Sequence, residues 1–144
     1  MGTAKTIKDN NFIGARTFTI IGTPHYMAPE IIAGKGYNCF VDLWSLGVIL
    51  FEFMCGYVPY GEDISDPYAI YEEIIKKKEL TFPNYLKDRL AKRMMQQLLN
   101  KVPELRLGGS FAILKANPWF EKFDWVKSIF LNFFVIFNIF GVFL

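Results

Sequence analysis

Cysteine and net charge are both scarce in this 144-residue sequence, and each scarcity argues against a class of function. The two cysteines, Cys39 and Cys55, have neither metal-ligand spacing nor a disulfide pattern, so we expect reduced thiols in an intracellular protein. The 16 basic and 14 acidic residues leave a formal net charge of +2, and no basic stripe carries interleaved aromatics, so a nucleic-acid partner is not expected. The N-terminus also lacks the charged and then apolar profile of a secretory signal. Together these features favour a cytoplasmic protein.

Hydrophobic residues, by contrast, are plentiful, at 52% of the chain, and 17% of residues are aromatic. A chain of this length and composition can bury one core, and its periodicity predicts a mainly α fold. The strongest helix is predicted over Asp42 to Met54, where apolar residues cover most of the circumference, as in a helix buried on every side. Its polar residues Asp42, Ser45 and Glu52 fall within about 80° of one another. We therefore expect another polar group to dock on this stripe.

Shorter helices are predicted on both sides of this one, with almost no strand. One begins at Glu30 and ends at Gly34 and Gly36. Another begins at Ser65-Asp66-Pro67, because a capping side chain there precedes a proline in the first turn. Helical spacing predicts a third from Leu86 to Asn100 and a short one from Phe111 to Ala116. The helix after Pro67 is expected to bury an apolar face made of Tyr68, Tyr71, Ile74 and Ile75.

One segment resembles the end of a protein-kinase activation segment: Gly22-Thr23-Pro24-His25-Tyr26-Met27-Ala28-Pro29-Glu30. Further blocks occur in the order and spacing of that family: Arg16-Thr17-Phe18-Thr19, Val41-Asp42-Leu43-Trp44-Ser45-Leu46-Gly47, Arg106-Leu107-Gly108-Gly109, and Trp119-Phe120 with Phe123-Asp124-Trp125. The chain resembles the large, mostly helical lobe of a serine/threonine protein kinase without the small β lobe, and is most similar to the cGMP-dependent group. The resemblance implies a partial kinase domain over residues 1–126 and an apolar tail over residues 127–144.

The resemblance implies a phosphorylation site in the activation loop. Thr19 matches the threonine that gains about two negative charges on phosphorylation, and Lys5 matches one of its cationic partners. Asn10 to Ala15 resembles an insertion that lengthens the stretch between them and bears on their contact. The alternative is that Thr19 is one hydroxyl in a threonine-rich loop.

The resemblance also implies a substrate pocket. Gly22, Thr23 and Pro24 match the pocket for the residue after the phosphoacceptor, and the alternative is an ordinary Gly-Thr-Pro turn. Glu52 matches a residue that receives a substrate arginine in cyclic-nucleotide-dependent kinases. A lone glutamate on an apolar helix would otherwise be a surface or interface residue. His25 is expected to be structural.

Other matched residues have structural roles in the family. Glu30 and Arg106 match a buried ion pair that ties the activation segment to a later helix. Asp42 matches the scaffold aspartate that holds the catalytic loop, and its alternative is a helix N-cap. Trp44 follows in the same block and is expected to be structural.

Several parts of a kinase do not appear in these residues. There is no glycine-rich phosphate loop and no catalytic loop, and Met1 stands at the Phe position of Asp-Phe-Gly before Gly2. No catalytic, cofactor-binding or metal residue is therefore assigned, and ATP and Mg²⁺ are expected only for the complete parent, which would phosphorylate basic peptides. We expect these residues alone to be inactive and marginally stable. The alternative from another class is a non-catalytic peptide-binding module.

The C-terminal residues Ile129 to Leu144 are almost wholly apolar. As a helix they would span about 24 Å, which is short of the roughly 30 Å hydrocarbon core of a bilayer. Asn132 and Asn138 would make insertion costlier. A membrane tail anchor and translated non-coding or frame-shifted sequence are the two interpretations. Membrane contact is expected only through residues 129–144.

Overall fold

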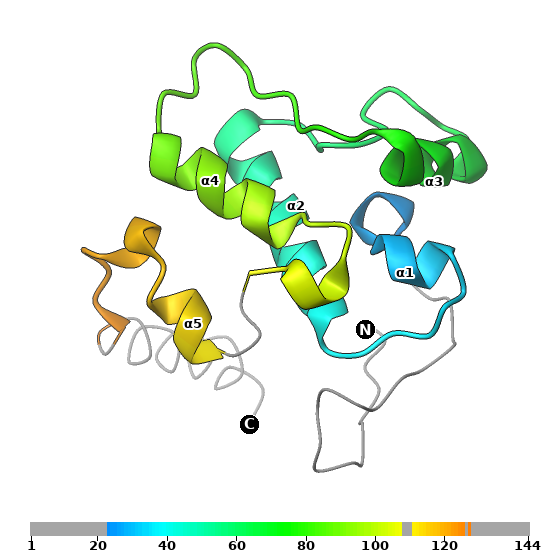
Figure 1. The fold of residues 1–144 in the computed structure, drawn as a ribbon. Helices are drawn as coiled ribbons and strands as arrows, with labels where there is room; N and C mark the ends of the chain where they lie inside the picture. The colour runs from blue at the N-terminus through cyan, green and yellow to red at the C-terminus, as the bar shows by residue number, and fades with distance from the viewer. Residues whose placement is uncertain (1–22, 108–110, 126, 128–144) are drawn as a thin grey trace, which may run out of the picture.

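The described part of the chain is helical, as the sequence predicts (Figure 1). A computed structural model describes residues 23–107, 111–125 and 127. No strand occurs within these ranges. The α-helices are α1 (Pro29–Ile32), α2 (Phe40–Cys55), α3 (Pro67–Lys76), α4 (Arg89–Leu98) and α5 (Phe111–Lys115), and the 3₁₀ helices are η1 (Pro24–Tyr26), η2 (Pro103–Leu105) and η3 (Pro118–Phe120).

Helix α2 is the central element of this arrangement. In Figure 1, α4 crosses α2, α1 and α3 lie together on one side of α2, and α5 lies on the other side. The predicted helix over residues 42–54 is confirmed, and α2 extends slightly beyond it at both ends. It ends where Gly56 adopts a left-handed conformation with φ of 80°, which glycine reaches without steric cost.

The start of α2 decides one of the interpretations of Asp42. Cys39 occupies the N-cap position, and the backbone N–H of Phe40 donates to Asn38 Oδ1 over 3.0 Å. Asp42 lies in the first turn, so the N-cap interpretation is wrong. A carboxylate in this turn is still favourable, because the N-terminal end of a helix carries partial positive charge.

The prediction that α2 is buried on every side is wrong. One face is buried, and its fully buried side chains include Trp44 and Phe51. Leu46, Ile49 and Phe53 are 37%, 38% and 82% exposed. Their spacing of three and four residues puts them on one face of the helix, which the described residues leave partly open. High hydrophobicity all round the helix could not show which side would be left open.

Capping side chains fix the starts of the next two long helices. Asp66 accepts a hydrogen bond from the Tyr68 N–H, with Pro67 in the first turn, as predicted. The buried residues of α3 are Ile70 and Ile74, whereas Tyr68 and Ile75 are exposed. The predicted apolar face of this helix was therefore wrong by part of a turn.

Helix α4 begins later than the sequence predicted. Asp88 caps it, and one carboxylate oxygen accepts from the N–H groups of Leu90 and Ala91, both over 2.9 Å. Leu86 therefore precedes the helix, but its side chain is still buried beside Phe51 and Met95. The cap at Asp88 sets where α4 begins, and the burial of Leu86 explains why the apolar spacing starts before the helix does.

Helices α2 and α4 approach closely at Gly47. A Cβ atom added there would lie 2.9 Å from Leu98 Cβ and 2.9 Å from Leu99 Cγ, closer than packed carbon atoms tolerate. Glycine is a poor helix former, so its presence in the middle of α2 is explained by this contact.

We expect Gly47→Ala to destabilise the fold despite its better helix propensity. Overpacking a core typically costs about 1–3 kcal/mol, while alanine gains about 1 kcal/mol of propensity over glycine. The net change should therefore be a loss of up to about 2 kcal/mol, seen as a lower urea midpoint by circular dichroism. The same exchange at Gly34 provides the steric control, because a Cβ there meets no atom within 4 Å and only its φ of 62° opposes alanine. A stabilised Gly47→Ala protein would contradict the close approach.

Candidate functional site

The 3₁₀ helix η1 docks on the polar stripe of α2. The Tyr26 hydroxyl donates to Glu52 Oε2 over 2.7 Å. Ser45 Oγ lies 3.1 Å from the Tyr26 carbonyl oxygen and 3.2 Å from that of Val41, and its single proton can be donated to either. The expectation that a polar group docks on the stripe is thus confirmed for two of its three residues. The third, Asp42, is exposed.

The hydrogen bond to Glu52 changes the acidity of Tyr26. Together with burial and the charge of the carboxylate, it raises the pKa of the Tyr26 phenol above its usual value. A raised pKa in the folded state means that the bond stabilises the fold fully below about pH 10, the usual tyrosine pKa. This contribution is lost as the pH rises through the raised pKa. Tyr26 is consequently a neutral hydrogen-bond donor over the physiological range.

A second contact holds η1 against the loop before α3. His25 Nε2 lies 3.2 Å from the carbonyl oxygen of Gly61. The Gly61 N–H in turn donates to Glu73 Oε2 over 2.9 Å, and Lys77 Nζ donates both to Glu73 and to the carbonyl oxygen of Pro59. The loop over residues 59–61 is therefore tied to α3 and to η1.

Thr23 and Pro24, two of the residues predicted to form the substrate pocket, lie at the start of η1. Thr23 is the exposed N-cap residue of η1, and Pro24 is the first residue of that helix. Because Tyr26 ends the same short helix, the structure brings Thr23 and Pro24 to the helix that contacts Glu52. Gly22 lies outside the described residues, as do Thr19 and Lys5. The substrate-pocket and phosphorylation roles remain predictions.

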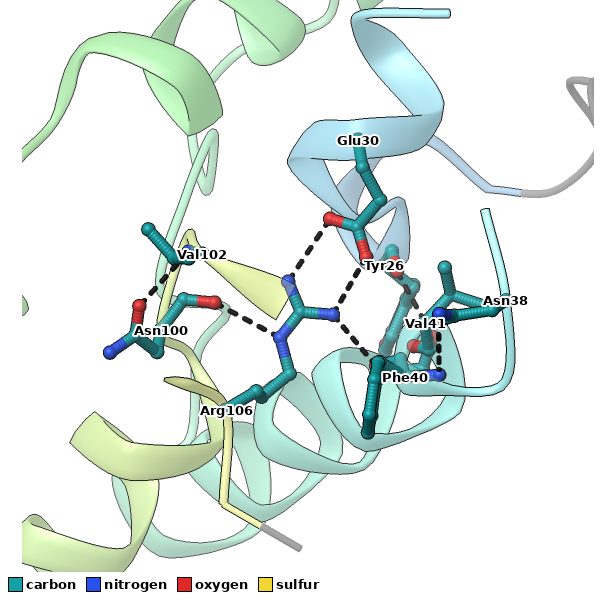
Figure 2. A network of polar contacts seen from close by, with 9 residues as sticks. Tyr26, Glu30, Asn38, Phe40, Val41, Asn100, Val102 and Arg106 are labelled. Carbon is teal, nitrogen blue, oxygen red and sulfur yellow. Dashed lines mark hydrogen bonds and ion pairs between the residues drawn. The ribbon is translucent and has the colours of Figure 1, made fainter. Parts of the chain in front are cut away.

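Glu30 and Arg106 form a buried ion pair, which Figure 2 shows. Arg106 Nη1 donates to Glu30 Oε1 over 2.8 Å and Nη2 donates to Glu30 Oε2 over 3.0 Å. The Arg106 side chain is 0% exposed and that of Glu30 8%. A bidentate arginine–carboxylate pair fixes the relative orientation of both groups, so α1 and the segment after η2 are held together.

Arg106 also contacts the start of α2 and the segment after α4. Its Nη1 donates to the carbonyl oxygen of Phe40 over 2.7 Å, and its Nε donates to that of Asn100 over 3.0 Å (Figure 2). The guanidinium carbon lies 5.3 Å from the centre of the Trp44 ring, within the range of a cation–π contact. Glu30 and two backbone carbonyl oxygens thus accept from four of the five guanidinium N–H groups, and the Trp44 ring lies against the guanidinium.

Trp44 is fully buried beside this ion pair. Its ring stacks on Tyr60 at a centroid distance of 5.7 Å with only 10° between the planes. Among the described residues its indole N–H has no hydrogen-bond partner. Burial and the charge of Glu73 raise the pKa of Tyr60 far above its usual value, so this stacked phenol stays neutral. Trp44 therefore acts through packing.

Tyr26 is the residue of this site that the sequence did not single out. It stands inside the kinase-like block, but the partner of its hydroxyl is 26 positions further along the chain. The polar stripe on α2 predicted that a partner existed without identifying it. Two contacting residues that lie so far apart along the chain leave no signal in the local sequence pattern.

Metal and membrane sites are not found in the described part of the chain. Within residues 23–107, 111–125 and 127, no three His, Cys, Asp or Glu side chains are grouped so that they could hold a metal ion. None of the helices described is both long and apolar enough to cross a bilayer. The apolar segment 129–144 lies outside these residues, so its membrane contact remains a prediction.

Comparison with known proteins identifies relatives over most of the chain. A family model described as the protein kinase domain matches residues 1–120. The chain is 46% identical over 116 residues to a cGMP-dependent protein kinase of Plasmodium berghei (strain Anka), covering 78% of this chain and 13% of the relative. It is 46% identical over 115 residues to a cGMP-dependent protein kinase of Toxoplasma gondii, covering 78% of this chain and 12% of the relative.

A related group of kinases matches somewhat less closely. Identity is 42% over 117 residues to a cAMP-dependent protein kinase catalytic subunit of Arthrobotrys oligospora, covering 78% of this chain and 22% of the relative. The chain therefore spans only between 12% and 22% of the length of these three relatives.

Proposed function

This chain belongs to the protein kinase family, and we propose on that basis that it supplies the peptide-docking part of a serine/threonine kinase. The complete kinase would transfer the γ-phosphoryl group of ATP to a serine or threonine in a basic peptide. The similarity to cGMP-dependent kinases supports the class of reaction. The peptide preference rests on the geometry around Glu52.

The observation that carries this proposal is the half-buried Glu52 carboxylate. Tyr26 occupies Oε2, and no hydrogen bond to Oε1 is found within the described residues. A carboxylate held in place by one donor is preoriented to accept another, and a guanidinium group is well matched to it. Thr23 and Pro24, at the start of the same short helix as Tyr26, would contact the peptide beyond its arginine.

A Mg·ATP site is not part of this proposal for the residues described. Magnesium in kinases is held by carboxylate and amide side chains together with the phosphates, and no acidic cluster suited to a metal occurs within the described ranges. The sequence of these 144 residues also contains no glycine-rich phosphate loop. We propose that this polypeptide on its own has neither measurable Mg·ATP affinity nor phosphoryl-transfer activity.

Replacing Glu52 by glutamine should weaken the binding of arginine-containing peptides about tenfold or more. Hydrogen bonds to a charged group contribute roughly 1.5–3 kcal/mol, and 1.4 kcal/mol corresponds to a factor of ten. The measurement is fluorescence anisotropy with a labelled peptide that carries two arginines before a serine. Its matched probe replaces both arginines by citrulline, which keeps the shape and removes the charge.

Glu79→Gln provides the control variant, because Glu79 is exposed and lies in the segment after α3, outside η1 and α2. It should bind the arginine peptide as the wild type does. Equal affinity of wild type and Glu52→Gln, or of the arginine and citrulline peptides, would remove the basis for peptide docking at Glu52.

The same surface would serve a non-catalytic peptide-binding module. Incubating the purified chain with peptide and radiolabelled Mg·ATP separates inactivity from activity, and incorporated phosphate would overturn the proposal that these residues alone are inactive.

A cytoplasmic location also belongs to the proposal. Fractionation of cells expressing the chain with and without residues 127–144 tests it, because a tail anchor would move only the longer form to membranes.

A further inference from the structure

A hollow of about 450 Å³ lies away from Glu52, in a different part of the fold. Its walls come from α1, from the loop that joins α1 to α2, from the last turn of α3 and from the segment between α4 and η2. Ala33, Lys35, Ile75, Lys101, Val102 and Pro103 are among the lining residues. The volume is in the range of known ligand pockets, which are about 300–1,000 Å³.

The walls of the hollow are largely apolar, with two large aliphatic side chains open to solvent. Ile75 is 48% exposed and Val102 is 47% exposed. Pro29, Ala33 and Pro103 add further apolar surface. Ile75 is the residue that the sequence placed on the buried face of its helix, and the structure places it in this hollow instead. Two half-exposed aliphatic residues facing one hollow can bury a ligand side chain between them.

With the paired Glu30 set aside, the lining carries two lysines, Lys35 and Lys101, and one glutamate, Glu104. Lys101 Nζ donates to the carbonyl oxygen of Ile75 over 2.8 Å, which places its ammonium group beside the apolar wall. Lys35 is exposed and its ammonium group has no partner among the described residues. Glu30 lines the base of the hollow, but its charge is compensated by Arg106. Glu104 is the remaining acid of the lining.

We propose that this hollow binds an acidic peptide segment of a partner protein. An aliphatic or aromatic side chain of that segment would lie against Ile75 and Val102, and a neighbouring carboxylate would pair with Lys35 and Lys101. Burial lowers the pKa of Lys101, so a carboxylate that pairs with this amine also favours its protonated form. The hollow would bind an acidic peptide, whereas Glu52 would bind a basic one, so the two proposals are independent.

Anisotropy with the full 144-residue chain tests the assignment. The probe is a fluorescein-labelled, capped peptide in which a Leu-Phe pair is flanked by glutamates on both sides. One matched peptide replaces the glutamates by glutamine, and another replaces Leu-Phe by Ala-Ala. We expect the first peptide to bind and each matched peptide to bind at least about fivefold more weakly.

Two variants of exposed residues locate the binding without disturbing the core. Lys35→Glu should weaken binding about tenfold, because it reverses one of the two cations, and Ile75→Ala should weaken it about threefold by removing apolar contact. Their controls are Lys122→Glu and Ile113→Ala, the same exchanges at exposed positions outside the hollow, and both should bind as the wild type does. Circular dichroism verifies that all four fold alike.

Several outcomes would overturn the proposal. Equal binding of the glutamate and glutamine peptides would exclude recognition of the carboxylates. An equal loss in Lys122→Glu and Lys35→Glu would show general attraction to positive charge instead of a site. A labelled fatty-acid anion that binds where the peptides do not would assign the hollow to another class of ligand. Glu52→Gln should leave the acidic peptide bound, which separates this test from that of the proposed function.

Discussion

Arg106→Leu is expected to lower the free energy of unfolding by about 3–5 kcal/mol. The substitution leaves the carboxylate of Glu30 buried without its cation and also leaves the carbonyl oxygens of Phe40 and Asn100 without their donor. Small domains have a total stability of about 5–15 kcal/mol, so the loss is a large fraction of it. A chain whose fold is marginal, as the sequence suggested, would be largely unfolded by this change.

Urea unfolding followed by circular dichroism measures this loss, or reveals an unfolded spectrum at zero urea. The matched control is Lys76→Leu, which removes the cation of the exposed pair between Lys76 and Glu72 on α3. Exposed pairs contribute only about 0–1 kcal/mol, so this variant should stay close to the wild type. Similar losses in the two variants would mean that burial does not distinguish the pairs.

A double variant tests the origin of the effect. Glu30→Leu with Arg106→Leu removes both charges, and it should be more stable than Arg106→Leu alone because no buried charge is left unpaired. If adding Glu30→Leu lowers the free energy of unfolding by as much again as Arg106→Leu did, the cost arises from lost packing and not from the unpaired charge of Glu30.

Trp44→Ala is expected to cost about 3–5 kcal/mol by leaving a cavity in the core. The ring is fully buried, stacks on Tyr60 and covers one face of the Arg106 guanidinium. Trp44→Phe should cost clearly less, since an aromatic ring remains and the indole N–H has no hydrogen-bond partner among the described residues. Thermal unfolding followed by circular dichroism ranks the two variants.

Phe53→Ala is the matched control on the same helix. Phe53 is 82% exposed, and substitutions of exposed residues usually change stability by no more than about 0.5 kcal/mol. Losses of similar size at positions 44 and 53 would contradict the assignment of buried and open faces on α2. Such a result would place the core on a different side of this helix.

Local signals in the sequence predicted most of the helices. The start of α3 follows from Asp66 and Pro67, because the cap and the proline act on the same turn that they occupy. The start of α4 was predicted too early, since Leu86 continues the apolar spacing although Asp88 is the residue that caps the helix. Periodicity reports burial, and a buried residue in a loop can extend the pattern beyond a helix.

Contacts between distant segments could not be predicted from spacing. Glu30 and Arg106 are 76 positions apart, and only the resemblance to kinases paired them. Tyr26 was not identified as the partner of Glu52 in any way. The exposed face of α2 was missed for a related reason. Hydrophobic residues show which faces of a helix could be buried, but not whether another segment of the chain packs against each face.

The two contacts of Tyr26 with α2 have a mechanical consequence. Its backbone carbonyl meets Ser45 and its hydroxyl meets Glu52, positions that lie roughly 10 Å apart along a helix that rises 1.5 Å per residue. A segment pinned at one point can pivot about it, whereas a segment pinned at two separated points cannot. The orientation of the 3₁₀ helix that begins at Pro24 is therefore fixed relative to the Glu52 carboxylate, and neither can be reoriented without the other.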